Sequence, residues 1–339
     1  MECHGVFFCL TDFKSELYNY NVIHMESREN PLFGRKIFFV SPSFVIEKFL
    51  FENLRKNEYE VYIINDYRKA KNILSIYTDS LCFINIDSEE LSYSEWFNYM
   101  KSFSLIESLK GTYLGVMTES ASWEDKDKFL MNIRLPGGFN QVAKTEQFLN
   151  NFIAILDLNG AKGRRKYIRL DTRGAEDVSG YMTYQGKLFT INIKDISSAG
   201  FAITYKQDII SLFQKNTLIR NLCISVGRKS MVCSCIVFNT QPNTDGTAMS
   251  VLMLTNENPE STKTYIRDYI FSKYDRAMSS VINDVDKDST SYSLPDEYSK
   301  IIAVRDRNYD ELEPLIEVDE GDNDSVAVSR ARDIDDDIL

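Results

Sequence analysis

Long apolar runs, histidine, glycine and proline are all scarce in this sequence. No apolar run approaches the length of about 18 residues that a membrane-spanning helix requires, so we expect no membrane span. Two histidines among 339 residues argue against a His-rich metal site, a Ser-His-Asp triad and a histidine kinase core. With 15 glycines and 7 prolines, the chain has no large low-complexity linker. Its hydrophobic content of 43% is enough for two domain cores.

Paired cysteines and a secretion signal are also missing. The six cysteines form no Cys-x-x-Cys pair, and the first ten residues, MECHGVFFCL, lack the basic segment and full apolar run of a signal peptide. We therefore expect reduced thiols and a cytoplasmic protein. Met25 is a candidate for the natural start, which would leave residues 1–24 outside the native protein, and we treat residues 1–34 as an N-terminal extension.

The net charge of −11 is concentrated in one segment of the chain. Residues 281–339 hold 18 acidic and 6 basic residues, whereas the remainder holds 32 acidic and 33 basic residues. The body is nearly neutral, so its charge does not argue against an anionic ligand. Residues 284–339 carry few large apolar side chains, which predicts a disordered acidic tail with a short helix at 308–317.

Short apolar runs alternate with helical patterns over residues 35–160. Strands are predicted at 36–40, 59–64, 81–86 and 113–117, and helices at 44–56, 68–77 and 145–158. Strands that alternate with helices predict a parallel sheet covered by helices on both faces.

This arrangement resembles, in outline, a receiver domain of two-component signalling. Asp87 ends the third predicted strand, where a receiver has its phospho-accepting Asp, and Thr118 follows the fourth, where the switch Thr or Ser stands. Ser41 and Ser43 occupy the places of the acids that hold magnesium in that family, and Gln141 falls near the place of its Lys. Without acidic ligands for magnesium, phosphoryl transfer loses its main charge neutralisation. We therefore expect a degenerate receiver-like domain that is not phosphorylated.

The composition changes at residues 159–163, where two glycines mark a hinge and a domain boundary. Beyond it, short strands predicted at 187–193, 201–205, 218–226, 231–238 and 249–254 are separated by turns, a pattern typical of a closed antiparallel barrel. Residues 260–283 form one helical pattern. We therefore predict a second domain over residues 161–283.

Two motifs in this second domain carry candidate binding chemistry. Arg165 and Arg169 have RxxxR spacing, and Asp195, Ser197 and Gly200 follow with DxSxxG spacing. The ordered pair resembles the signature of the PilZ family, which binds the bacterial second messenger cyclic di-GMP. The resemblance covers residues 161–283 and implies a β-barrel with a terminal helix, together with a ligand held by both motifs.

The residue types suit a ligand with two phosphates and two guanines. The planar guanidinium of Arg binds phosphate oxygens or the guanine O6/N7 edge with paired hydrogen bonds, and it stacks on purines. Asp195 can accept hydrogen bonds from guanine N1–H and N2–H, and Ser197 offers a hydroxyl group. Gly200 allows close backbone approach or a positive φ.

Some features of the motif leave alternatives open. Arg173 lies four residues beyond Arg169, so a second RxxxR register exists. Arg164 directly precedes the motif, and in the family an Arg there is associated with an intercalated pair of ligands rather than one. Residues 248–250, Ala-Met-Ser, stand where the family often has a Gly in its last strand.

We therefore predict a cytoplasmic, non-catalytic bacterial receptor for cyclic di-GMP that needs no other cofactor and no metal. Binding would order residues 164–169 against 195–200, reorient the two domains and signal to a protein partner. The family implies an output such as motility, and we expect no nucleic acid polymer as partner. Two other hypotheses are a protein-interaction module without a ligand and a response regulator that acts through Asp87.

Overall fold

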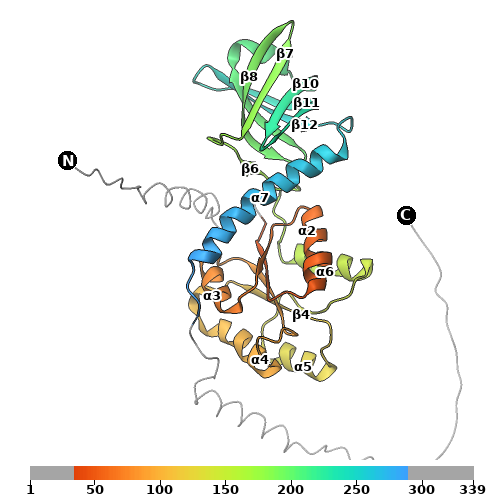
Figure 1. Cartoon of the computed structure of the whole chain (residues 1–339), viewed down its shortest axis with the longest axis vertical. Coiled ribbons are helices and arrows are strands. Elements are labelled where there is room, and N and C mark those ends of the chain that lie inside the picture. The colour runs from red at the N-terminus through yellow and green to blue at the C-terminus, as the bar shows by residue number, and fades with distance from the viewer. Residues whose placement is uncertain (1–33, 289–339) are drawn as a thin grey trace, which may run out of the picture. The chain divides into compact units, whose positions relative to one another are not determined.

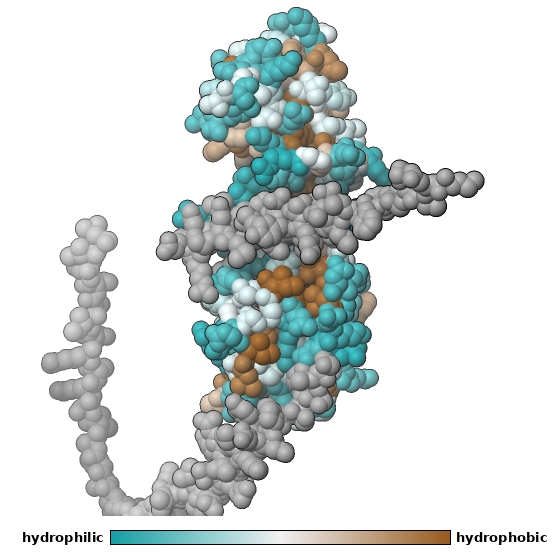
Figure 2. Space-filling model, turned by 90° about the vertical axis from the view of Figure 1, so that its left-hand side faces the viewer, coloured by the Kyte–Doolittle hydropathy of each residue, from teal (hydrophilic) through white to brown (hydrophobic). Residues whose placement is uncertain are grey.

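The computed structural model describes residues 34–288. Nearly all of the predicted N-terminal extension, and the acidic tail from residue 289 with its predicted helix at 308–317, lie outside the described residues. Within residues 34–288, every helix is too short or too polar to span a lipid bilayer. Hydrophilic residues cover much of the described surface in Figure 2, and hydrophobic residues occupy separate smaller areas.

A five-stranded sheet forms the first half of the described chain. Its strands are β1 (Ile37–Val40), β2 (Val61–Ile64), β3 (Leu81–Asn85), β4 (Tyr113–Thr118) and β5 (Phe139–Gln141). They lie in the order β2-β1-β3-β4-β5, and every pair is parallel. This is the flavodoxin-like order, which the receiver CheY also has. The predicted receiver-like α/β architecture is confirmed.

Helices cover both faces of this sheet (Figure 1). One face carries the π-helix η1 (Ile46–Phe51), α2 (Glu52–Lys56) and α6 (Glu146–Leu158), and the other carries α3 (Tyr67–Ile76), α4 (Tyr93–Lys101) and α5 (Trp123–Asn132). Two short 3₁₀ turns, η2 (Ser102–Leu105) and η3 (Glu107–Leu109), follow α4. Both faces of the central strands are buried, so these strands are mostly apolar, as β1 (IFFV) shows. The helix predicted at 44–56 is divided into η1 and α2.

A closed barrel forms the second half. Its strands are β6 (Leu170–Asp171), β7 (Val178–Tyr184), β8 (Lys187–Ser197), β9 (Gly200–Lys206), β10 (Leu218–Val226), β11 (Lys229–Pro242) and β12 (Thr247–Leu254), with the 3₁₀ helix η4 (Gln207–Phe213) after β9. The strand order is β6-β8-β7-β10-β11-β12-β9. Because β8 also pairs with β9, six strands form a closed ring, and β6 pairs with β8 outside it. The predicted antiparallel barrel is confirmed.

The terminal helix α7 (Glu260–Asp284) confirms the helix predicted at 260–283 and bonds to both halves. On the barrel side, the Tyr265 hydroxyl donates to the carbonyl of Val226 over 2.9 Å. On the receiver-like side, Arg55 of α2 forms a two-pronged ion pair with Asp275, in which one N–O distance is 2.8 Å. The two halves are therefore joined by the linker at 159–169 and, through noncovalent contacts, by α7.

Candidate functional site

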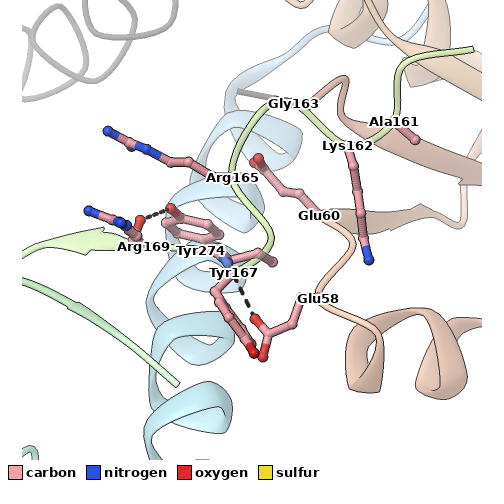
Figure 3. A pocket seen from close by; sticks show the side chains of 11 residues that line it. Glu58, Glu60, Ala161, Lys162, Gly163, Arg165, Tyr167, Arg169 and Tyr274 are labelled. Carbon is pink, nitrogen blue, oxygen red and sulfur yellow. Dashed lines mark hydrogen bonds between the residues drawn. The ribbon is translucent and has the colours of Figure 1, made fainter. Parts of the chain in front are cut away.

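An open, shallow pocket of about 50 Å³ lies along the linker between the sheet and the barrel. Linker residues 161–163 line it together with Arg165 and Arg169, and Glu58 and Glu60 line it from the receiver-like half (Figure 3). Its volume is below the range of about 300–1,000 Å³ that is usual for small-molecule sites, so it is a hollow on the surface rather than an enclosed cavity. The site is therefore built from both halves of the described chain.

Arg165 and Arg169 extend in the same direction from the linker, away from Glu58 (Figure 3). The backbone of Arg169 is held by Tyr274 of α7, whose hydroxyl donates to the Arg169 carbonyl over 2.5 Å. Burial lowers the pKa of Arg165, and the neighbouring charge of Arg169 adds to this effect.

The two motifs meet because β6 pairs with β8. The antiparallel register sets Asp171 opposite Asp195, so the end of the RxxxR segment lies beside the start of DxSxxG. The Nη1 atom of Arg169 lies 3.9 Å from Oδ1 of Asp195. This is too long for a hydrogen bond but within the distance of a weak ion pair.

Asp195 has a raised pKa because its carboxyl group is largely buried, and Arg169 and Arg165 partly offset this shift. Because the nearest guanidinium nitrogen of Arg169 is beyond hydrogen-bonding distance, this carboxylate can accept hydrogen bonds from a ligand. Arg165, Arg169 and Asp195 thus come together as an acceptor flanked by two cations.

Ser197 and Gly200 lie at the turn between β8 and β9 and have structural contacts there. The buried Ser197 hydroxyl donates to the carbonyl of Gly200 over 3.1 Å. A Cβ atom on Gly200 would lie 2.0 Å from the carbonyl oxygen of Leu252 in β12, so this position requires glycine because of close approach and not because of a positive φ.

The remaining predicted residues are placed differently. Arg164 is exposed on the linker and does not line the pocket. Arg173, the second member of the alternative register, is held by Asp171, with Nε 2.9 Å from Oδ2 of that carboxylate. The pocket is therefore lined by the register of Arg165 and Arg169, and the roles of all six motif residues stay predictions.

At the receiver-like position, both carboxylate oxygens of Asp87 accept hydrogen bonds from the protein. Thr118 Oγ1 donates to Oδ1 over 2.8 Å, and the amide of Glu119 donates to Oδ2 over 2.5 Å. Ser43 at the magnesium-binding place bonds Glu119 over 2.7 Å. Among residues 34–288, no group of three metal-ligating His, Cys, Asp or Glu side chains is present.

Three residues near the pocket were not identified from the sequence: Glu58, Glu60 and Tyr274. Tyr274 belongs to an apolar stripe of the terminal helix. Its hydroxyl group bonds to the carbonyl of Arg169 only because folding brings α7 beside the linker. Glu58 and Glu60 flank the start of a strand, and no motif surrounds them. Only the packing of the sheet against the linker brings them to the site.

No protein-family model matches the sequence, and no curated protein matches it. Solved structures similar to parts of the chain include MrkH of K. pneumonia in complex with c-di-GMP, at 17% identity and a TM-score of 0.31, covering 34% of this chain and 55% of MrkH. The PilZ domain of Escherichia coli YcgR with c-di-GMP has 13% identity and a TM-score of 0.30, covering 36% of this chain and 99% of that domain.

The match to MrkH therefore spans about half of that protein's length. The response regulator CheY4 of Vibrio cholerae has 16% identity and a TM-score of 0.30, covering 36% of this chain and 99% of CheY4. Structures similar to parts of this chain thus include PilZ-domain proteins that bind c-di-GMP and a chemotaxis response regulator.

Proposed function

We propose that this chain is a non-catalytic receptor for cyclic di-GMP, which binds where Arg165, Arg169 and Asp195 converge. The observation that carries the proposal is the approach of Arg169 to Asp195, at 3.9 Å between Nη1 and Oδ1. Two segments that are 26 residues apart in the chain meet at this point in the order and spacing of the PilZ motifs. Together they offer cations for phosphates and an acceptor for guanine.

Each of the three side chains has a role in the proposed complex. The guanidinium groups of Arg165 and Arg169 project on one side of the linker, so they can contact one ligand together. Each can form paired hydrogen bonds with a phosphate or with the O6/N7 edge of guanine. Asp195 accepts hydrogen bonds from N1–H and N2–H of a guanine, which adenine cannot supply. Arg164, exposed beside them, would contact a second, intercalated ligand molecule.

Ligand binding would signal through the linker. Residues 164–169 gain contacts with the ligand, and the same segment connects the receiver-like sheet to the barrel. Ordering one segment can change the angle between two domains. We propose that a protein partner recognises the arrangement of the ligand-bound form, and that the receptor acts in the cytoplasm.

The test is calorimetric titration of the full chain with cyclic di-GMP and, as a matched control, with cyclic di-AMP. We expect micromolar or tighter binding of cyclic di-GMP, which corresponds to about −8 kcal/mol. Cyclic di-AMP has the same phosphates but lacks the N1–H and N2–H donors that would pair with Asp195, so we expect its affinity to be at least about 100-fold lower. Absence of heat with cyclic di-GMP at tens of micromolar would leave the interaction module without a ligand as the better hypothesis.

We also expect the affinity for cyclic di-GMP to fall as the pH is lowered. Burial raises the pKa of Asp195 above its ordinary 3.8, so the folded, unliganded protein takes up this proton at a higher pH than a free Asp does. Guanine binds the ionised carboxylate, so binding must expel the proton once the pH approaches that pKa. Titrations from about pH 7.5 down to about pH 5 measure this loss. The variant D195N should bind cyclic di-GMP more weakly at every pH, and its affinity should depend less on pH. If the affinities of D195N and the wild type fell equally steeply with pH, Asp195 would not be the group that takes up the proton.

A further inference from the structure

Glu58 of the receiver-like half joins the two segments that form the proposed ligand site. Its Oε1 atom accepts a hydrogen bond from the hydroxyl of Ser198 over 2.6 Å. Its Oε2 atom accepts one from the amide of Ile168 over 3.3 Å, which is the dashed line at Glu58 in Figure 3. Ile168 directly precedes Arg169, and Ser198 directly follows Ser197. One carboxylate therefore connects the linker to the β8–β9 turn, with one oxygen for each.

The backbone of Glu58 is in an unfavourable conformation. Helix α2 ends in a Schellman motif: the amide of Glu58 donates to the carbonyl of Arg55 over 3.0 Å, and the amide of Tyr59 donates to that of Leu54 over 3.0 Å. Glu58 has a φ of 63° at the position of this motif that glycine usually occupies. A side chain that persists there despite the strain indicates a role outside the helix terminus.

The surroundings of Glu58 hold its carboxyl group in place. The side chain is half-buried, and burial raises its pKa, while its two hydrogen bonds and the charges of Arg267 and Lys162 act in the opposite direction. A half-buried carboxylate with two protein donors is a fixed structural contact rather than a solvated surface charge.

We propose that Glu58 is a positioning residue of the nucleotide site, supplied by the receiver-like domain, which holds the linker and the β8–β9 turn in the register that lets Arg169 and Asp195 face one ligand. This inference rests on the proposed function. The two arginines extend from the linker away from Glu58 (Figure 3), so in this proposal Glu58 acts through the backbone of Ile168 and does not touch the ligand. Without it, the linker would have to be ordered at the moment of binding, which lowers affinity.

The informative variant is Glu58→Gly. Glycine relieves the strain at φ 63° but removes both hydrogen bonds, so we expect E58G to be no less stable than the wild type in urea unfolding. We expect its affinity for cyclic di-GMP to be about tenfold lower, because the linker is no longer held in place before the ligand binds. A purely structural residue would not give this combination of kept stability and weaker binding.

Four further variants separate the effect of the two Glu58 hydrogen bonds from that of its charge. Glu58→Gln can still accept from the Ile168 amide and donate to the Ser198 hydroxyl, which accepts as well as donates, so we expect affinity within about threefold of the wild type. Ser198→Ala should weaken binding, and the E58G/S198A double variant should bind no more weakly than E58G alone. Glu124→Ala removes an exposed acid of the same domain and should have no effect.

Hydrogen exchange of residues 163–169, measured on the full chain without ligand, provides a second readout. We expect the Ile168 amide to exchange at least about tenfold faster in E58G than in the wild type. Wild-type affinity in E58G, or unchanged exchange at Ile168, would overturn the positioning role. If the wild type itself does not bind cyclic di-GMP, the proposed function fails, and the exchange result alone decides whether Glu58 holds the linker.

Discussion

Replacing Arg169 with alanine is expected to lower the affinity for cyclic di-GMP by about 100-fold or more while leaving the fold intact. Among residues 34–288, the guanidinium of Arg169 has one ion-pair contact, with Asp195 at 3.9 Å, and its side chain is 39% exposed. Removing a half-exposed group with so weak a contact should change the free energy of unfolding by no more than about 0.5 kcal/mol. Most of the interaction energy of Arg169 therefore remains available for a ligand.

Calorimetry on R169A and on Arg173→Ala measures this effect, with urea unfolding as the check on stability. Arg173 is the matched control, because it belongs to the alternative register and is held by Asp171. We expect R173A to bind within about threefold of the wild type. Loss of binding in R173A together with normal binding in R169A would show that the second register holds the ligand.

Replacing Gly200 with alanine is expected to destabilise the barrel by about 3 kcal/mol. The new Cβ atom would lie 2.0 Å from the carbonyl oxygen of Leu252, a backbone atom that cannot rotate away. Gly200 pairs with Met253 in β12 and with Ser197 in β8, so the clash falls where the barrel closes. The expected result is a lower urea midpoint with little change in the slope of the transition.

Gly174→Ala is the control for this prediction. An added Cβ at Gly174 meets no atom within 4 Å, but its φ of 77° is unfavourable for alanine. We therefore expect a loss of only about 1 kcal/mol, from backbone strain alone. Equal destabilisation by the two substitutions would mean that close approach to β12 is not what requires glycine at position 200.

The pattern of apolar and polar residues along the sequence predicted much of the architecture. The apolar runs that became β1 to β4 are buried on both faces, and such runs are recognisable because every position is apolar. Strand β7 was not predicted because Ser179 and Gly180 interrupt its alternation, and it is held by pairing with β8 and β10. Similarly, the division of the first helix into η1 and α2 has no sequence signal that we can identify.

The sequence by itself determined which residue types carry the candidate chemistry and their order along the chain. Only the tertiary structure decided which of them meet: the β6–β8 pairing brings Arg169 to Asp195 and leaves Arg173 with Asp171. It also brought Glu58 and Tyr274 to the site from segments distant along the chain. The physical reason is that motif spacing reports local geometry, whereas these contacts depend on strand register and on the packing of separate elements, which no short segment encodes.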